Sequence, residues 1–292
     1  MIVIVGRRFF PTPKSKEIGS PGLDGAESDP LIEMVEVHKA FDHPVLKGIS
    51  LQINPGEIVG VLGKSGTGKS VLLKLAVALL KPDKGKVLFR GQDITAMTEA
   101  ELLQVRKQVS YVFQSGAIFD FLNVRENIAY SLREQGVTDE QKIAERVDYL
   151  LNAVEMEGLG DLQSEEMGPG SKKQVAIARA IANNPRAILF DEPTTGVDPI
   201  VGKSLSRLIR KINDQENFTS VVVTHDLKCL EIVADRIILL KDGYIHFEGD
   251  QEEFHSSSDP FIQAFIEGKR YDEPQVQAPR GAALTLQSRQ TT

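Results

Sequence analysis

The segment from 63 to 70 constrains the fold of this chain more than any other. It matches the pattern G-x-x-x-x-G-K-[ST], and its residues are Gly63, Lys64, Ser65, Gly66, Thr67, Gly68, Lys69 and Ser70. The apolar run 58–62 before it predicts a buried strand, and the apolar run 69–81 after it predicts a helix. A glycine loop in that position turns backbone N–H groups toward an anion, and the helix N-terminus adds positive potential. The segment therefore predicts a loop that binds nucleotide phosphates, with Lys69 reaching the β and γ phosphates and Ser70 ligating Mg²⁺.

Two carboxylates follow a second apolar run. The run 187–190 predicts a strand, and it leads directly into Asp191 and Glu192. Beside a phosphate loop on a parallel sheet, Asp191 would hold Mg²⁺ through water, and Glu192 would orient or deprotonate an attacking water. His225 follows the predicted strand 220–224 and would reach the same edge of the sheet. A lone histidine is more often structural, so the spacing alone leaves its role open.

The order of the elements predicts an α/β fold with a mainly parallel sheet. Strands at 187–191 and 220–224 are separated by an amphipathic helix, and apolar strands alternating with helices indicate a parallel sheet covered on both faces. Short antiparallel strands are expected from 31 to 57, and helices dominate from about 92 to 183. Capping boxes predict two helix starts in that stretch, Asn123 with Glu126 and Thr138 with Gln141. Lys241, Asp242 and Gly243 predict the turn of a late hairpin.

The chain divides into four stretches with different compositions. We expect a flexible leader over 1–30, a folded domain over 31–250, a C-terminal helical extension over 251–268 and a disordered tail over 269–292. The net charge of −7 argues against a protein that binds nucleic acid by bulk charge. Cys229 is the single cysteine, which fits a reducing compartment. The apolar runs fall short of the ~20 residues that a membrane-spanning helix needs, so the chain is not expected to cross a bilayer by itself.

Taken together and in order, several segments resemble the ATPase subunits of ATP-binding-cassette (ABC) transporters. The resemblance covers about 31 to 250 and is carried by the phosphate loop, Gln114 after 111–113, the stretch 175–180, the Asp191–Glu192 strand, the stretch 193–199 and the triplet 224–226. It implies a phosphate-loop core with an N-terminal antiparallel β subdomain and an inserted helical subdomain at about 92–183. It also implies ATP hydrolysis with Mg²⁺.

The same resemblance implies that two copies dimerise head to tail, with each ATP between one copy's phosphate loop and the other's signature segment. By matching positions, Phe41 would stack on adenine and Asp198 would reach across the dimer. Gln114 would sense Mg²⁺, take part in catalysis and couple to a membrane partner, and His225 would contact the γ-phosphate.

A narrower resemblance is to the ATPase subunits of MCE-type, Mla-like lipid-trafficking transporters. It rests on the segments 113–119, 123–124, 259–261 and 265–268. It implies transport of phospholipid or a related lipid, an integral-membrane permease, and a lipid-binding MCE-type subunit in the same complex. The chain would then be peripheral, on the cytoplasmic face of a plasma or inner membrane or its organelle equivalent. The stretch 117–121 would form an apolar groove for a permease helix, although core packing would also explain its apolar residues.

The signature segment, residues 167–171, departs from the family pattern. Where Leu-Ser-Gly-Gly-Gln or Leu-Ser-Gly-Gly-Met is expected, the chain has Met167, Gly168, Pro169, Gly170 and Ser171. Gly168 lacks the serine hydroxyl of the family pattern, and Pro169 has no N–H to offer to a phosphate. We expect Ser171 with Gln174 to cap the following helix, whose dipole would still attract phosphate together with Lys172 and Lys173.

This departure keeps a second function open. The first is an ATP-hydrolysing subunit of a lipid transporter, in which Gly170 and Ser171 still contact the nucleotide of the other copy. The alternative is a nucleotide-binding regulatory subunit that scarcely turns over. A soluble ATPase acting on nucleic acid is disfavoured by the charge and by the lack of long coiled-coil insertions.

Overall fold

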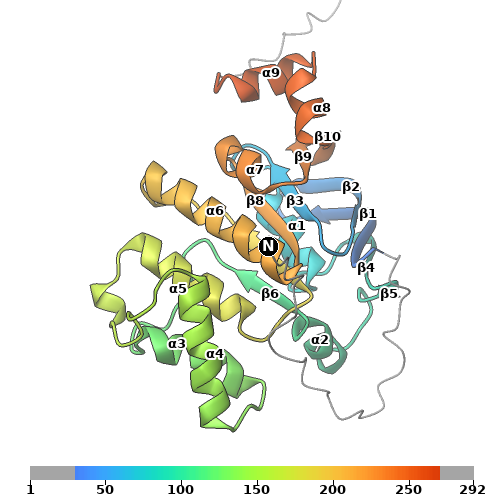
Figure 1. Ribbon diagram of the computed structural model, residues 1–292. Coiled ribbons are helices and arrows are strands. Elements are labelled where there is room, and N and C mark those ends of the chain that lie inside the picture. The colour runs from blue at the N-terminus through green and yellow to red at the C-terminus, as the bar shows by residue number, and fades with distance from the viewer. Residues whose placement is uncertain (1–29, 270–292) are drawn as a thin grey trace, which may run out of the picture. The chain divides into compact units, whose positions relative to one another are not determined.

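The computed structural model describes residues 30–269, which fall into two compact units divided between Phe254 and His255. The first unit holds two β-sheets and the helices that cover them (Figure 1). The predicted leader and tail lie, apart from their innermost residues, outside the described part of the chain. Among residues 30–269, no helix is both long and apolar enough to span a membrane.

The larger sheet has six strands in the order β10-β9-β3-β8-β7-β6. Their bounds are β3 Ile58–Leu62, β6 Val109–Val112, β7 Ala187–Asp191, β8 Thr219–Thr224, β9 Arg236–Lys241 and β10 Tyr244–Gly249. All neighbours pair in parallel except β9 and β10, which form the predicted antiparallel hairpin. Because β3, β7 and β8 run in parallel, the segments that follow them meet at one edge of the sheet. The phosphate loop, the two carboxylates and His225 all follow these strands.

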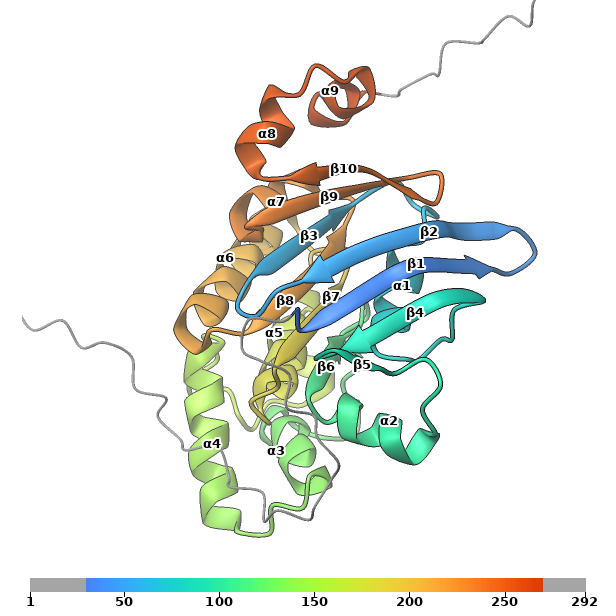
Figure 2. The same ribbon diagram turned by 90° about the vertical axis from the view of Figure 1, so that its right-hand side faces the viewer.

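The central strands are buried on both faces because helices cover the sheet from two sides. Every residue of β3, β7 and β8 is buried, as the apolar runs within them predict. The covering helices are α1 Lys69–Ala76, α6 Pro199–Glu216 and α7 Leu227–Val233. In Figure 2, α6 and α7 lie on one side of the strands and the second sheet lies on the other. The prediction of an α/β fold with a mainly parallel sheet is confirmed.

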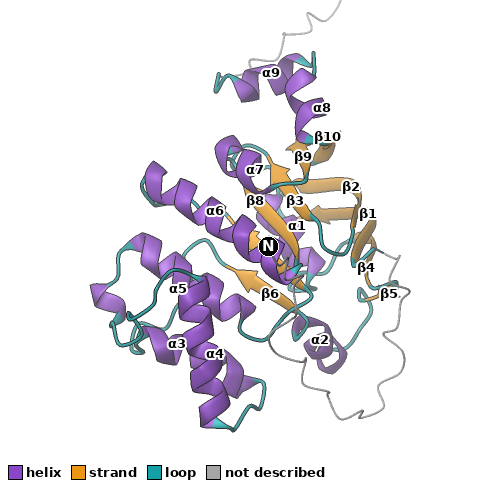
Figure 3. Ribbon diagram, in the orientation of Figure 1, coloured by secondary structure: helices purple, strands orange, loops and turns teal. Residues whose placement is uncertain are grey.

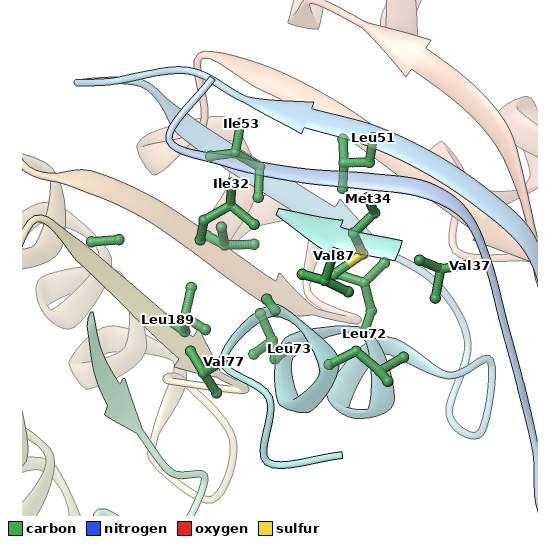
Figure 4. Close-up of a cluster of buried hydrophobic side chains, with 14 of the residues drawn as sticks. Ile32, Met34, Val37, Leu51, Ile53, Leu72, Leu73, Val77, Val87 and Leu189 are labelled. Carbon is green, nitrogen blue, oxygen red and sulfur yellow. The ribbon is translucent and has the colours of Figure 1, made fainter. Parts of the chain in front are cut away.

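The second sheet is antiparallel, with four strands in the order β2-β1-β4-β5. Their bounds are β1 Ile32–Ala40, β2 Pro44–Ile53, β4 Lys84–Phe89 and β5 Gln92–Asp93. Figure 4 shows Ile32, Met34 and Val87 of this sheet gathered over Leu72 and Leu73 of α1. Each fully buried leucine contributes about 1.5–3 kcal/mol. Since an isolated helix as short as α1 is marginal in water, this burial is what stabilises it.

The helix predicted over 69–81 ends earlier than expected. It stops at Ala76, because Ala78 takes a left-handed conformation with φ +52° and the Leu79 N–H donates to the Lys74 carbonyl. Two more carbonyls beyond the helix, those of Val77 and Ala78, accept from the Arg106 side chain. These contacts satisfy the backbone without a further helical turn.

A group of helices is inserted between β6 and β7 and lies to one side of the sheets (Figures 1 and 3). It consists of α3 Val124–Glu134, α4 Glu140–Ala153, the 3₁₀ turn η1 Ser164–Glu166 and α5 Pro169–Ile181. The insertion is narrower than the 92–183 expected, because β5, helix α2 Glu99–Arg106 and β6 belong to the two sheets and their surroundings. Strand β6 was not recognised in the sequence, because that strand has only four residues.

The two predicted capping boxes have different outcomes. Asn123 is the N-cap of α3, and its side chain accepts from the Glu126 N–H, but the Glu126 carboxylate accepts from Arg133, so only half of the predicted box forms. Thr138 is not the cap of α4, since Asp139 takes that position and accepts from the N–H groups of Gln141 and Lys142. Both residues are good caps, and the aspartate one step later adds a negative charge to the helix N-terminus.

The described chain after β10 contains two short helices. Helix α8 spans Gln251–Ser256 and follows β10. The second unit contains α9, Pro260–Ile266, whose N-cap Asp259 accepts from the N–H groups of Phe261 and Ile262. These helices lie in the range expected to be a helical extension.

Candidate nucleotide site

The phosphate loop lies between β3 and α1. Gly68 is the N-cap of α1 with φ +97°, and a side chain there would also meet Val45 and Leu46 of β2 at under 3 Å. Glycine is therefore required at this position, both for the backbone conformation and for the close approach of β2. Lys69 is only 6% exposed, and its ammonium donates to the carbonyls of Gly63 at 2.9 Å and Lys64 at 3.1 Å. The chain thus holds a cation inside the curl of the loop.

Asp191 is held through both of its carboxylate oxygens. The Ser70 hydroxyl donates to Oδ1 at 2.8 Å, and the Tyr111 hydroxyl donates to Oδ2 at 2.8 Å. Burial and the neighbouring Asp191 raise the pKa of Tyr111 far above its ordinary value, so the phenol keeps its proton. Sequence reasoning placed Ser70 and Asp191 at the site but gave Tyr111 no role.

The oxygens of Ser70 and Asp191 fit the needs of Mg²⁺. This ion prefers oxygen ligands, keeps several waters, and binds through one or two carboxylates together with substrate phosphates. A hydroxyl and a carboxylate oxygen 2.8 Å apart at the mouth of a phosphate loop match that set. Over residues 30–269, no group of three or more His, Cys, Asp or Glu side chains is placed to hold a metal without such phosphates.

Glu192 is oriented by three polar groups at the ends of β7 and β8. Its Oε2 lies 2.8 Å from His225 Nδ1, and it accepts from the hydroxyls of Thr195 at 3.0 Å and Thr224 at 3.2 Å. Its Oε1 lies 3.5 Å from the Lys69 ammonium. The backbone of Glu192 is left-handed, with φ +50°, which is uncommon outside glycine and is found preferentially at functional sites. The structure thus brings Lys69, Glu192 and His225 together.

Gln114 is linked to Glu192 through a buried lysine. Lys173 of α5 donates to the Gln114 carbonyl at 2.5 Å and lies 3.3 Å from the Glu192 carbonyl. Burial lowers the pKa of Lys173, while the charges of Glu192 and Asp191 act in the opposite direction. The Gln114 side chain is exposed, and the contact with Lys173 involves only its backbone. The expected role of Lys173 in attracting phosphate is wrong for this structure, because its ammonium points inward.

Within the described residues, neither Phe41 nor Asp198 belongs to the hydrogen-bonded cluster around Lys69. Phe41 lies in the turn between β1 and β2, is 57% exposed, and has the Lys39 ammonium 5.5 Å from its ring centroid. Asp198 is exposed and caps α6 by accepting from the Ile200 N–H at 2.8 Å. Both side chains are accessible from solvent, as contacts with a base or with a second copy would require.

The altered signature segment forms the start of α5. Gly168 is the N-cap, and as a glycine it has no side chain that could cap the helix. Pro169 is the first residue of the helix. The expectation that Ser171 caps this helix is therefore wrong. Proline at the first helical position has the φ that a helix needs and lacks only an N–H that the helix does not use, so the helix starts there and Ser171 falls in its first turn. Gly170 packs against Val201 of α6, whose Cγ1 would lie 2.6 Å from an added Cβ.

A cavity of about 300 Å³ opens beside this helix start. It is lined by Gln114, Ser115, Met167, Pro169, Lys172, Lys173, Thr195 and Gly196. The signature segment, Gln114 and the loop after β7 therefore line the same cavity. Lys172 lies on its wall with its ammonium 3.9 Å from an Asp120 carboxylate oxygen.

A second surface of interest lies on the helical insertion. We call Phe119, Phe121 and Tyr130 the aromatic patch. The ring centroid of Phe119 lies 5.7 Å from that of Phe121 and 4.7 Å from that of Tyr130. Phe121 is 81% exposed. The Arg179 guanidinium lies 4.7 Å from the Phe119 ring, and the buried Asn127 side chain bonds both the N–H and the carbonyl of Phe119. The patch is thus apolar and exposed, and contacts with Arg179 and Asn127 hold Phe119 in place.

The chain resembles known proteins over most of the described region. A family described as "ABC transporter" matches residues 46–195. The ATP-binding protein MlaF of an intermembrane phospholipid transport system in Haemophilus influenzae is 37% identical over 231 residues, which are 79% of this chain and 88% of that protein. The chloroplastic protein TRIGALACTOSYLDIACYLGLYCEROL 3 of Arabidopsis thaliana is 38% identical over 264 residues, 85% of this chain and 76% of that protein.

Solved structures resemble it as well. One shows a dimeric ATP-binding cassette in a post-hydrolysis state bound to ADP and Pi. It superposes with a TM-score of 0.68 at 31% identity, over 75% of this chain and 98% of that one.

Proposed function

The chain belongs to the ABC transporter family, and we propose that it binds Mg²⁺ and ATP between two copies of itself and hydrolyses the nucleotide to drive lipid transport across or between membranes. The observation that carries this proposal is the placement of Glu192. Its carboxylate is bonded to His225, Thr195 and Thr224 and faces Lys69, the cation of the phosphate loop. A buried carboxylate oriented in this way is suited to accept a proton from a water molecule beside the γ-phosphate.

Six side chains at this site have distinct tasks in this mechanism. Lys69 leaves the carbonyls of Gly63 and Lys64 and pairs with the β and γ phosphates. Ser70 and Asp191 would hold Mg²⁺, which would neutralise phosphate charge when bound with the nucleotide. Glu192 takes the proton of the attacking water, and His225 supports both Glu192 and the γ-phosphate. Gln114 joins this group from the loop that Lys173 ties to Glu192.

The dimer is proposed from two exposed features and from the relatives. The start of α5 and Asp198 are both open to a second copy, as contacts made across a dimer require. The related cassette with ADP and Pi is a dimer. In that arrangement Gly170 and Ser171 of one copy meet the nucleotide held by the phosphate loop of the other, and Phe41 stacks on the adenine.

The transported lipid and the membrane partners are proposed from the names of relatives. One is the ATP-binding protein of an intermembrane phospholipid transport system, so we assign this chain to a transporter of phospholipid or a related lipid. Its permease would dock on the aromatic patch, and a lipid-binding MCE-type subunit would belong to the same complex. The chain would then lie at the cytoplasmic face of the membrane or its organelle equivalent.

A second candidate is supported by the start of α5. Gly168 has no hydroxyl and Pro169 has no N–H, where the family pattern has both groups. A subunit that binds ATP and dimerises but scarcely hydrolyses it would have this feature.

Phosphate release by the purified full chain separates the two candidates. We expect steady release that depends on Mg²⁺ and falls to background in Glu192→Gln. Release by the parent no faster than by Glu192→Gln, with ATP shown to be bound, would instead support the regulatory subunit.

The membrane partner is tested separately. We expect Phe121→Asp to lose co-purification with an integral-membrane subunit while phosphate release by the isolated chain stays unchanged. Tyr244→Asp is the matched control, since Tyr244 is a half-exposed aromatic on β10, outside the aromatic patch. Equal retention of the membrane subunit by both variants would place the docking surface elsewhere.

A further inference from the structure

The proposed mechanism gives no task to the hydroxyl of Tyr111, which is bonded to Asp191. Tyr111 lies on β6, which pairs in parallel with β7, and its side chain reaches forward to the residue that ends β7. Its hydroxyl donates to Oδ2 of Asp191 at 2.8 Å. Oδ1 of the same carboxylate accepts from Ser70, also at 2.8 Å. Asp191 is 7% exposed, so the surrounding protein has to satisfy it.

The two bonds together do what neither does alone. Ser70 fixes only one carboxylate oxygen, and the group could still turn about its bond to Cβ. A second donor on the other oxygen fixes the plane of the carboxylate. Tyr111 keeps its own place through ring packing, because its centroid lies 4.4 Å from that of Phe113. The phenol is thus a donor carried by a strand of the sheet.

We propose that Tyr111 is a positioning residue for the metal of this site, acting through Asp191. It fixes the plane of the carboxylate that, with the Ser70 oxygen, would hold the Mg²⁺ that accompanies the nucleotide, directly or through water. This rests on the proposed function, since it assumes a nucleotide with its metal at the phosphate loop. Groups that orient a metal ligand from behind typically change metal affinity 10- to 100-fold when they are removed.

Tyr111→Phe isolates the hydroxyl, because it keeps the ring and its packing on Phe113. The matched control is Tyr149→Phe, since Tyr149 also donates to a carboxylate, that of Glu216, in another part of the first unit. The readout is the affinity of Mn²⁺ for the complex of protein and ADP, from the EPR signal of free Mn²⁺. Tyr111→Phe should weaken Mn²⁺ binding by about tenfold or more. It should also leave ADP affinity in EDTA and the thermal midpoint close to those of the parent.

The control should leave Mn²⁺ affinity unchanged. An unchanged Mn²⁺ affinity in Tyr111→Phe would overturn the inference, and so would an equal loss of ADP affinity in EDTA, which indicates general damage to the site. A parent that binds neither ADP nor Mn²⁺ would instead overturn the proposed function.

A double variant tests the route through Asp191 and does not depend on how far the single variant shifts the affinity. If Tyr111 acts through Asp191, adding Tyr111→Phe to Asp191→Asn should change Mn²⁺ affinity no further. A loss in the double variant equal to the product of the two single losses would mean that Tyr111 acts independently, and would overturn the inference.

Discussion

The Lys69 ammonium lies between the phosphate loop, which would bind the nucleotide, and Glu192, the proposed base. It is buried and bonded to the carbonyls of its own loop, and Glu192 lies 3.5 Å away. Lys69→Ala should weaken ATP binding by about 10- to 150-fold, since a hydrogen bond to a charged group is worth about 1.5–3 kcal/mol. Titration with a fluorescent ATP analogue measures this directly. Binding as tight as in the parent would show that the loop does not hold the phosphates.

Glu192 should matter for the chemical step and not for binding. Glu192→Gln keeps an oxygen that can accept from Thr195 and Thr224 but loses the basic carboxylate. Turnover should fall by about 10²- to 10⁴-fold, while ATP affinity stays within a few-fold of the parent. Because bound ATP then persists, light scattering should find an ATP-dependent dimer. A monomer with ATP demonstrably bound would contradict the proposed dimer.

The sequence was informative about those side chains that a motif defines. Lys69, Ser70 and Asp191 could be placed because a glycine loop and a strand that ends in carboxylates, taken together, have few other uses. Tyr111 could not, since a tyrosine in a strand is ordinary and its contact depends on which strands become neighbours. Lys173 was expected to attract phosphate for a similar reason. That its ammonium donates to the Gln114 carbonyl depends on packing between segments far apart in the chain.

At the scale of elements, the start of α5 gives the sharpest prediction. Gly168→Ser with Pro169→Gly restores the hydroxyl and the N–H of the family pattern at the N-cap and first residue of the helix. If both act in the other copy's site, turnover should rise at least about tenfold, because one charge-assisted hydrogen bond is worth about 1.5–3 kcal/mol. Nucleotide affinity of the isolated monomer should stay nearly unchanged.

Phosphate release and monomer binding assays check this pair of changes, with Gly168→Ser alone as the control that adds a helix cap. A parent that already hydrolyses ATP rapidly, and a double variant that adds nothing, would show that the remaining groups of this helix start are sufficient.

Element types could be predicted more reliably than their ends. The strands β3, β7 and β8 and the antiparallel sheet could be predicted because their apolar patterns fit a strand and no other element. The start of α4 was predicted one residue early because Thr138 and Asp139 can both cap, and the start of α5 was misplaced because the serine signal at Ser171 competes with a proline that fits the first turn. Strand β6 was missed because its four residues are recognisable as a strand only beside β7.

At the scale of the whole molecule, the alkylation rate of Cys229 measures how often the buried core becomes accessible to solvent. Cys229 lies on α7, is 1% exposed, and burial raises its pKa to about 11. Since the thiolate is the reactive form, iodoacetamide at pH 8 should modify the folded protein at least roughly a hundredfold more slowly than the protein in denaturant. Mass spectrometry over time measures both rates. Rapid, complete alkylation of the folded chain would contradict the buried position of this thiol.

The same shift has a consequence for stability with a definite sign. Because the folded pKa of Cys229 is raised, its contribution is fully present below the unfolded value near 9 and is lost as the pH rises through about 11. The parent should therefore lose stability relative to Cys229→Ala between these two values, as denaturant midpoints measured across that range would show.

The pairing of β3 also fixes when the site can form as the chain is made. On one side Ile58 pairs with Ser220, and on the other Val59 pairs with Arg236, so both partners of this strand are synthesised long after it. At about 5–20 residues per second, a ribosome needs roughly ten to thirty seconds to reach the end of β9 after making the phosphate loop. During that time β3 has two unpaired edges and α1 has no finished sheet to cover. A fragment ending at 195 should therefore aggregate or be degraded, and ATP should not protect it, although it contains the whole loop.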